Sequence, residues 1–509
     1  MSAIAQRTAR GLRSLVVVGG GAAGWMAAAA LARVLRPESC AVTVVEPNTG
    51  GAVGDAQGSI PNLRAFHGLL GIDESEFLRA THATGKLATR FRDWGAPGQT
   101  FLHPFGSYGV DSKHELFQAY WLGLRGAGRP SPLEEWSVTG LAATLGRFGA
   151  RPTNDSTPLQ HPLRRLSYAY HLDVALYARF LRTYAESRGV HRVAGEVVDV
   201  TLDPLGRIAS LRLADGRALG GDFFIDCSGF EGRLIAGALN AGYEDWSRWL
   251  PCDRAVSIEC ERTSEPAPVT EATARESGWQ WRIPLRERTG NGYVYCSAYV
   301  ADDEATEELL ARAAGAPLTD PRLQRFKAGR RASAWVGNCL ALGEAAGFLE
   351  PLEATGLHLV QTGLGRLFGL FPDRDFDPAI SAEYNRLTAL EHERVRDFLV
   401  LHYAAAQRDD APFWRHCRAM QLPETLAHKR DLFAQAGRIA NLEEETFAPA
   451  SWLAVYTGLG VWPEHPEPVI DIHGSAAIAA RFEAMPEQMR KAVETLPTHA
   501  NYLKEVARN

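Results

Sequence analysis

Residues 15–32 read LVVVGGGAAGWMAAAALA and carry no charged side chain. An apolar stretch of this length would be long enough to cross a membrane as a helix. Three consecutive glycines follow the run of valines, however, and this order predicts a strand, a tight turn and a helix instead. A second strand is predicted at residues 41–46, AVTVVE. The chain is therefore expected to begin with a βαβ unit and to have no membrane partner.

The turn of this unit carries a dinucleotide-binding pattern. GxGxxG falls at Gly19, Gly21 and Gly24, and Glu46 ends the second strand 22 residues after Gly24. Such glycines allow a tight turn and the close approach of a pyrophosphate to the helix N-terminus, while the carboxylate accepts hydrogen bonds from ribose hydroxyls. We expect a dinucleotide site here, and the alternative is a glycine-rich turn that serves packing alone.

The rest of the chain mixes helical and strand patterns. Helices are expected at residues 74–83, 170–189, 304–314 and 378–445. Strands are expected at 86–94, 192–213, 222–230, 254–300 and 335–343, and loops at 51–61, 95–110 and 128–164. Together these elements predict a mixed α/β (α+β) fold.

The composition excludes several classes of function. Hydrophobic residues make up 46% and charged residues 22% of the 509, as in ordinary soluble proteins. The formal net charge is −6 without a basic stripe, so nucleic acid is not an expected partner. The seven cysteines are scattered without CxxC pairs or Cys/His clusters, so no metal site is predicted. The sparse cysteines and the absence of a signal-peptide pattern favour a cytoplasmic location.

Residues 347–371, GFLEPLEATGLHLVQTGLGRLFGLF, combine an acid with a predicted helix start. Glu353 precedes Thr355 and Gly356, after which apolar residues recur at helical spacing. A helix N-terminus offers unpaired N–H groups and a positive dipole end, which suit an anion. This stretch therefore predicts an anion pocket beside one carboxylate, although an acid favoured only by the helix dipole would look the same.

A second pattern lies at residues 279–284, WQWRIP. Strand alternation places Trp279, Trp281 and Ile283 on one face, and for an arbitrary sequence that would indicate core packing.

Taken together, the motifs resemble those of flavin-dependent halogenases of the tryptophan-halogenase type. The resemblance extends over residues 14–370 and is weaker in the C-terminal helices. The motifs are GGGAAGWMAAAALAR at 19–33, GKLATRFRDW at 85–94, HPFG at 103–106, DFFIDCSGFEG at 222–232, WQWRIP at 279–284 and GFLEPLEATGLH at 347–358.

The resemblance implies an FAD-binding fold like that of flavoprotein monooxygenases, with an added, mostly helical substrate-binding region. The FAD-binding core would consist of residues 1–100, 160–250 and 330–375. The substrate-binding region would consist of residues 101–159, 251–329 and 376–509.

The resemblance also implies a chemistry. Reduced FAD and oxygen would convert chloride or bromide, held near Thr355 and Gly356, into hypohalous acid. Lys86 would meet this electrophile, by a hydrogen bond or as a haloamine, and Glu353 would polarise it or take the ring proton. Further expected FAD contacts, beyond the three glycines and Glu46, are Asp226, Gly343 and Glu344.

An electron-rich aromatic substrate, indolic by resemblance, would lie across a tunnel from the flavin. The residues expected along the substrate side and the tunnel are His103, Phe105, Trp279, Trp281, Ile283, Pro284 and Trp452.

The chain departs from the family pattern at three places. Glu344 stands where an aspartate is common, and the flavin strap at residues 53–61, VGDAQGSIP, is two residues longer than usual. The tyrosine pair that grips free tryptophan is not found, which disfavours that substrate.

Only one dinucleotide pattern is present, so reduced FAD is expected from a separate flavin reductase.

Several readings stay open at this point. An aromatic monooxygenase on the same scaffold and a non-enzymatic flavin-binding protein are the alternatives to a halogenase. The substrate, the ring position, the preferred halide and the oligomeric state, including a homodimer, are not specified by the sequence.

Overall fold

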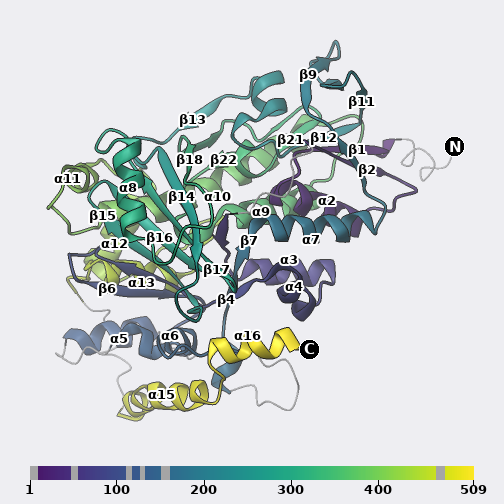
Figure 1. Ribbon diagram of the computed structural model, residues 1–509. Helices are drawn as coiled ribbons and strands as arrows, with labels where there is room; N and C mark the ends of the chain where they lie inside the picture. The colour runs from purple at the N-terminus through teal and green to yellow at the C-terminus, as the bar shows by residue number, and fades with distance from the viewer. Residues whose placement is uncertain are drawn as a thin grey trace.

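The computed structural model describes residues 10–47, 55–110, 117–126, 132–150, 161–465 and 476–508. Two large sheets dominate it (Figure 1), with the six-stranded sheet on the right of the view and the seven-stranded sheet on the left. Strands β4 and β7 lie between them, and α5, α6, α15 and α16 gather at the bottom.

The six-stranded sheet contains the βαβ unit expected from the sequence. Its strand order is β20-β21-β12-β1-β2-β8, with all pairs parallel except β20–β21. Val16 pairs with Thr43 on one side and with Phe224 on the other. The strands are β1 (Ser14–Val18), β2 (Ala41–Glu46), β8 (His191–Ala194), β12 (Phe223–Asp226), β20 (Trp335–Val336) and β21 (Cys339–Ala341).

Helix α2 (Ala22–Val34) explains the long uncharged stretch. Its residues from Trp25 to Leu31 are buried, because the helix packs against α7 (Val174–Glu186) and α9 (Gly356–Gly369). An apolar helix covered on several sides needs no charged face. Among the described helices, none combines the length and apolar character needed to cross a membrane.

The seven-stranded sheet runs β18-β14-β17-β16-β15-β5-β6 and is antiparallel except for the β15–β5 pair. The WQWRIP motif forms β16, where Trp281 lies opposite Gly292. A Cβ at Gly292 would come within 1.9 Å of the Trp281 ring, so glycine makes room for this indole. The strands are β5 (Ala88–Arg92), β6 (Thr100–Pro104), β14 (Arg254–Glu261), β15 (Val269–Arg275), β16 (Gly278–Pro284), β17 (Arg288–Tyr295) and β18 (Arg322–Arg325).

A small sheet, β3-β7-β4, links the two large ones. Strand β3 (Ala56–Gly58) contacts β16 and β17, while β7 (Ala169–Asp173) contacts α3 and α7. Lys86 ends β4 (Thr84–Lys86) and pairs with Ala169. The two remaining sheets consist of β9 (Val197–Leu202), β10 (Ile208–Leu213) and β11 (Ala218–Gly220), and of β13 (Tyr243–Asp245), β19 (Gly329–Arg331) and β22 (Gly347–Phe348).

The remaining helices cover these sheets. They are α3 (Asn62–Leu70), α4 (Glu74–Thr81), α5 (Phe117–Gly126), α6 (Val138–Thr144), α8 (Asp302–Arg312), α10 (Pro378–Ala404), α11 (Pro412–Ala419), α12 (Glu424–Ala436), α13 (Pro449–Gly458), α15 (Ala476–Glu494) and α16 (His499–Arg508). Short 3-10 turns include η1 (Leu133–Trp136), η2 (Pro162–Arg165), η5 (Gly343–Ala345) and η6 (Leu352–Ala354).

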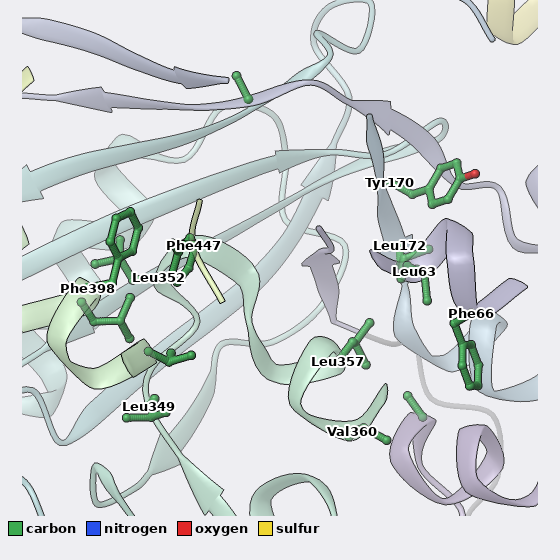
Figure 2. Close-up of a cluster of buried hydrophobic side chains, with 14 of the residues drawn as sticks. Leu63, Phe66, Tyr170, Leu172, Leu349, Leu352, Leu357, Val360, Phe398 and Phe447 are labelled. Carbon is green, nitrogen blue, oxygen red and sulfur yellow. The ribbon is translucent and has the colours of Figure 1, made fainter. Parts of the chain in front are cut away.

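The core continues beneath α9 and the loop before it. In Figure 2, Leu357 and Val360 of α9 lie toward Leu63 and Phe66 of α3, and all four are buried. On the other side, Leu349 and Leu352 lie toward Phe398 and Phe447, whose rings stack at 3.8 Å. Burial of each such side chain contributes about 1.5–3 kcal/mol, so this core fixes the position of the α9 N-terminus.

Several sequence-based assignments of secondary structure need correction. The expected loop at 51–61 contains β3 in its described part. The expected loop at 95–110 contains β6, which lies at the edge of the seven-stranded sheet. An edge strand tolerates Pro104, because the missing N–H interrupts no hydrogen bond between two inner strands. The helix expected from residue 170 begins at Val174, after strand β7, because β7 pairs with β3 and β4. The expected loop at 128–164 contains η1 and α6, and residues 127–131 and 151–160 lie outside the described part.

The division into two regions stays a prediction. Its boundary after residue 100 falls inside β6, after the first residue of that strand, and β6 pairs with β5 in one sheet.

Candidate active site

The loop before α9 has an unusual backbone. Glu350, Glu353 and Ala354 have φ angles of 67°, 64° and 60°, which L-residues adopt at a cost of about 1–3 kcal/mol each. Thr355 then caps α9 with no side-chain hydrogen bond to its first turn. The surrounding structure must hold this conformation, and the buried contacts of Glu350 and Glu353 do so.

The glycines of the turn differ in how much space surrounds them. Gly19 has φ 117°, and a Cβ there would lie 2.1 Å from the Cys227 carbonyl oxygen. A Cβ at Gly24 would lie 1.8 Å from the Gly19 oxygen. At Gly21, by contrast, a Cβ would meet nothing within 4 Å, and this residue caps the N-terminus of α2. The open space at a helix N-terminus fits the pyrophosphate of a dinucleotide.

Two expected FAD residues have different surroundings. Glu46 lies beside the turn, where it accepts from Trp25 Nε1 at 3.1 Å and pairs with Arg192. Asp226 is fully buried, and its carboxylate accepts from the backbone and hydroxyl of Ser228 and from the amides of Leu234 and Ile235. Asp226 therefore organises the turn after β12, and its expected role as a direct FAD contact stays a prediction.

A cavity of about 250 Å³ joins the glycine turn to the α9 N-terminus. It brings together Gly21, Gly343, Glu344, Thr355 and Gly356, which come from two distant segments of the chain, the glycine turn and residues 343–356. These expected cofactor and halide residues thus share one space.

A second cavity of about 610 Å³ lies on the other side of the same loop. Gln57, Glu344, Phe348 and Pro351 line both this cavity and the smaller one. Its further walls include Lys86, Trp279, Trp281, Ile283 and Glu353.

A third cavity of about 670 Å³ is lined by His103, Phe105 and Glu353, together with Tyr108 and Phe447. Glu353 is thus the one acidic residue that the described walls of the second and third cavities have in common. Two expected tunnel residues line none of the three cavities. Pro284 accepts a hydrogen bond from Thr84, and Trp452 is packed beneath Lys429.

Glu353 is held by two histidines through one oxygen. Its Oε1 lies 2.7 Å from His103 Nδ1 and 3.2 Å from His402 Nε2. Although burial would raise the pKa of the Glu353 carboxyl, the two histidines hold it well below its usual range. The carboxylate is therefore ionised at neutral pH, and its second oxygen is left for other partners.

His402 was not expected from the sequence. It lies inside α10, is fully buried, and its Nδ1 is 2.8 Å from the Phe398 carbonyl, to which it must donate. A histidine within a long helical pattern gives no signal of such a contact, because only the fold brings α10 beside Glu353.

Lys86 is 1% exposed, and among the described residues its ammonium has no hydrogen bond or ion pair. It lies 5.2 Å from the centre of the Phe105 ring. Burial lowers the pKa of Lys86 to about 8, against the opposing effect of Glu353. An ammonium without a protein partner, facing a cavity, is available to a ligand.

The tryptophan motif is attached to the same loop. Trp279 Nε1 donates to Glu350 Oε2 at 3.3 Å, and the Tyr403 hydroxyl donates to the same oxygen at 2.6 Å. Burial raises the pKa of Glu350 to about 7. The first tryptophan is thus an anchor for the loop, while Trp281 lies opposite Gly292 along the cavity wall.

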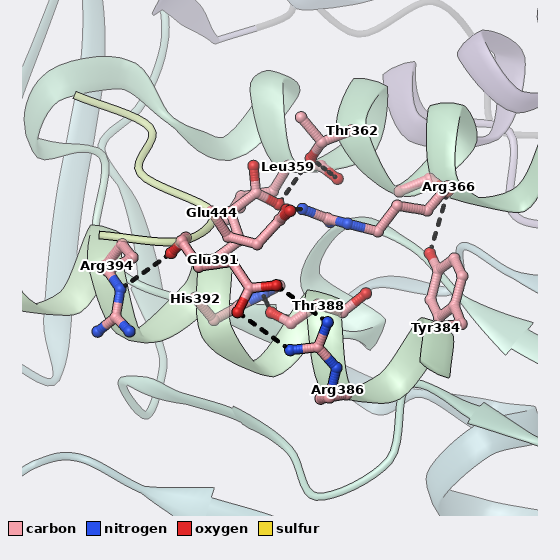
Figure 3. Close-up of polar contacts among 12 residues, drawn as sticks. Leu359, Thr362, Arg366, Tyr384, Arg386, Thr388, Glu391, His392, Arg394 and Glu444 are labelled. Carbon is pink, nitrogen blue, oxygen red and sulfur yellow. Dashed lines mark hydrogen bonds and ion pairs between the residues drawn. The ribbon is translucent and has the colours of Figure 1, made fainter. Parts of the chain in front are cut away.

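Helices α9 and α10 are joined by polar contacts that Figure 3 shows. Glu391 of α10 accepts from Thr362 at 2.8 Å and from Arg366 at 2.7 Å, both on α9. The Tyr384 hydroxyl donates to the Gly363 carbonyl at 3.1 Å. These contacts fix α9 relative to α10, the helix that carries His402.

Comparison with known proteins identifies the family. The family model described as tryptophan halogenase matches residues 14–475. The chain is 34% identical over 512 residues to the tryptophan 6-halogenase SttH of Streptomyces toxytricini, covering 96% of this chain and 97% of that protein. It is 32% identical to the tryptophan 7-halogenase RebH of Lentzea aerocolonigenes, covering 96% and 98%.

The fold agrees. The structure of BrvH, a flavin-dependent halogenase from Brevundimonas sp. BAL3, superposes with a TM-score of 0.92 at 45% identity, covering 97% of this chain and 99% of BrvH. The α/β architecture is accordingly an FAD-binding fold, and FAD and a halide are the cofactor and substrate that such an enzyme uses. The open glycine turn, the three adjoining cavities and these relatives lead to one conclusion: the chain belongs to the tryptophan halogenase family of flavin-dependent halogenases.

Proposed function

We propose that the enzyme attaches chloride or bromide to an electron-rich aromatic substrate other than free tryptophan, with Lys86 and Glu353 as its catalytic residues. The observation that carries this proposal is the position of Glu353 in the wall between two cavities. One cavity adjoins the expected flavin and halide residues, and the other has room for an organic substrate.

The residues around the two flavin-side cavities would hold FAD. Gly21 and the α2 N-terminus would face the pyrophosphate, and Glu344 and Phe348 would extend the site toward the α9 loop. When bound, reduced FAD supplies the electrons with which dioxygen oxidises halide to hypohalous acid, with water as the other product. A separate reductase would deliver the reduced cofactor, because the sequence has one dinucleotide pattern.

The α9 N-terminus would hold the halide through the amides of Thr355 and Gly356. Gln57 reaches the same place, since its Nε2 lies 3.4 Å from the position of a Cβ built on Gly356. The side-chain amide would provide a further donor, and it comes from the strap, which is longer here than in the family pattern.

Lys86 would receive the hypohalous acid through its ammonium donors, which no described residue engages. Glu353 would take the proton that leaves the ring carbon when the carbon–halogen bond forms, and the hypohalous oxygen would leave as water. His103 and His402 are positioning residues in this scheme, because both hold Oε1 and leave Oε2 toward the reaction.

The third cavity supports the choice of substrate. Its volume of about 670 Å³ exceeds what a bare indole fills, and its described walls contain no carboxylate besides Glu353 to bind the ammonium of a free amino acid. A substituted indole or a larger aromatic fits this lining better than free tryptophan.

The deciding experiment is a panel of indoles and phenols with FAD, a flavin reductase, and chloride or bromide, analysed by mass spectrometry. The expected result is a halogenated product from at least one aromatic and little or none from free tryptophan. Incorporation of oxygen without halogen would identify a monooxygenase instead. Binding of FAD with no product across the panel would favour a non-enzymatic flavin-binding protein.

A further inference from the structure

Tyr108 lies on the loop that follows β6 and lines the 670 Å³ cavity. Its side chain is 6% exposed, and its ring stacks on Phe117 at 6.5 Å and 21°. Within the part of the chain that the structure describes, its buried hydroxyl has no hydrogen-bond partner. The mechanism proposed above makes no use of this residue.

The backbone around Tyr108 is fixed on two sides. The Gly109 amide donates to the Trp136 carbonyl at 2.7 Å, and Arg165 donates to the Gly109 carbonyl at 3.2 Å. The position of the residue is thus fixed, although its hydroxyl makes no hydrogen bond within the described part of the chain. A buried donor without a partner is costly and rare in native structures, and one in a cavity wall is explained by a ligand that pairs with it.

The hydroxyl stays protonated at working pH and is therefore able to donate a hydrogen bond. Burial, together with the charges of Glu134 and Glu353, raises the pKa of Tyr108 well above its usual value. Thr446, which lines the same cavity from a distant segment, has a second buried hydroxyl without a partner among the described residues. Two such groups around one cavity indicate that its occupant carries oxygen acceptors as well as a ring.

We infer that the Tyr108 hydroxyl is a specificity-determining donor that pairs with an oxygen acceptor on the aromatic substrate, a carbonyl, a carboxylate or a phenol oxygen. This inference rests on the proposed function and narrows its substrate class from any electron-rich aromatic to rings that bear such an oxygen. Arg164 and Arg165 line the same cavity, so a negatively charged acceptor would also be accommodated.

The test compares Tyr108→Phe with the parent enzyme on indole, indole-3-acetate and 5-hydroxyindole. For the oxygen-bearing substrate that the parent uses best, kcat/KM is expected to fall about 10- to 100-fold, the effect of losing a buried hydrogen bond to a substrate. For indole, which has no oxygen, the change is expected to stay below about twofold. Equal losses on all substrates, or no loss on any, would overturn the inference.

Two controls separate this role from a structural one. Tyr456→Phe removes another buried hydroxyl without a partner, which lines none of the three cavities and whose ring packs on Phe433 at 4.4 Å. That variant should leave the ratio between substrates unchanged. The melting temperature of Tyr108→Phe should equal or exceed that of the parent, because no internal hydrogen bond is lost, and a fall of several degrees would contradict the inference. A parent enzyme that halogenates indole but neither oxygen-bearing substrate would overturn the inference and leave the proposed function standing, whereas a parent that halogenates nothing across the panel of indoles and phenols would overturn the proposed function itself.

Discussion

Two lysines in this protein are equally buried and differ in what surrounds the charge. Lys86 and Lys429 are each 1% exposed, and each lies over an aromatic ring, Phe105 at 5.2 Å and Trp452 at 4.1 Å. Lys429 forms an ion pair with the buried Glu445. Lys86 has no ion pair among the described residues and faces a cavity. The difference shows that burial alone does not mark a reactive lysine.

The two lysines differ in how far the cost of burying their charge is offset. Burial lowers the pKa of both lysines, but the Glu445 carboxylate compensates the charge of Lys429. For Lys86, the shift of the pKa from 10.5 to about 8 corresponds to about 3 kcal/mol that the folded state loses by holding the charged form at pH 7. This loss is present below pH 8 and disappears as the pH rises through 8 toward 10.5. The protein thus keeps an unfavourable charge at the place where the proposed mechanism uses one.

The largest expected effect is on the stability of Lys429→Met. The substitution leaves Glu445 buried without its partner, and breaking a buried pair in this way costs about 3–5 kcal/mol of unfolding free energy. Urea denaturation followed by fluorescence measures the change. Activity per folded molecule should stay near that of the parent, because neither residue lines the cavities. A variant as stable as the parent would show that the pair is not a structural element.

Lys86→Met should have the opposite pattern. Product formation is expected to fall about 100- to 1,000-fold, the usual effect of removing a donor from a charged reaction site. Unfolding free energy should rise by up to about 3 kcal/mol at pH 7, because the uncompensated charge is gone. Hypohalous acid should still form and escape, which a halogen-sensitive dye detects. Unchanged product yield would remove Lys86 from the mechanism.

The sequence predicted the elements around the site, but not the contacts that hold its charged residues. The glycine pattern and the alternating apolar residues predicted the βαβ unit and β16, because both depend on local periodicity. The contact between His402 and Glu353 depends on how α10 packs, which no local pattern encodes. The hydrogen bonds of Asp226 to its own turn could not be predicted for a related reason: an acid before a Ser-Gly turn looks the same in sequence whether it binds a cofactor or caps the turn.

The pH dependence tests which form of Lys86 works. With a pKa of about 8, the ammonium fraction falls about tenfold per unit above that pH, so a hydrogen-bonding ammonium predicts that product per hypohalous acid formed declines from pH 8 to 9.5. A haloamine route uses the neutral amine and predicts a rise over the same range. The residual activity of Lys86→Met, measured in parallel, corrects for titration of the hypohalous acid itself.

The smallest expected effect comes from Gly58→Ala, which places a methyl group beside the Lys86 ammonium. A Cβ at Gly58 would lie 3.1 Å from Lys86 Nζ and 3.3 Å from the Ala354 Cβ, and the flexible ammonium would have to shift by a few tenths of an ångström. Gly58 has no positive φ, so the backbone accepts alanine without strain. We expect the ratio of product to trapped hypohalous acid to fall about two- to fivefold, since small displacements of a catalytic group are costly. Gly68→Ala on α3 is the matched control, because a Cβ there meets nothing within 4 Å and should leave the ratio unchanged. An unaltered ratio in Gly58→Ala would mean that product formation tolerates a small displacement of the Lys86 ammonium. The charge of Lys86, and not its exact position, would then determine the ratio.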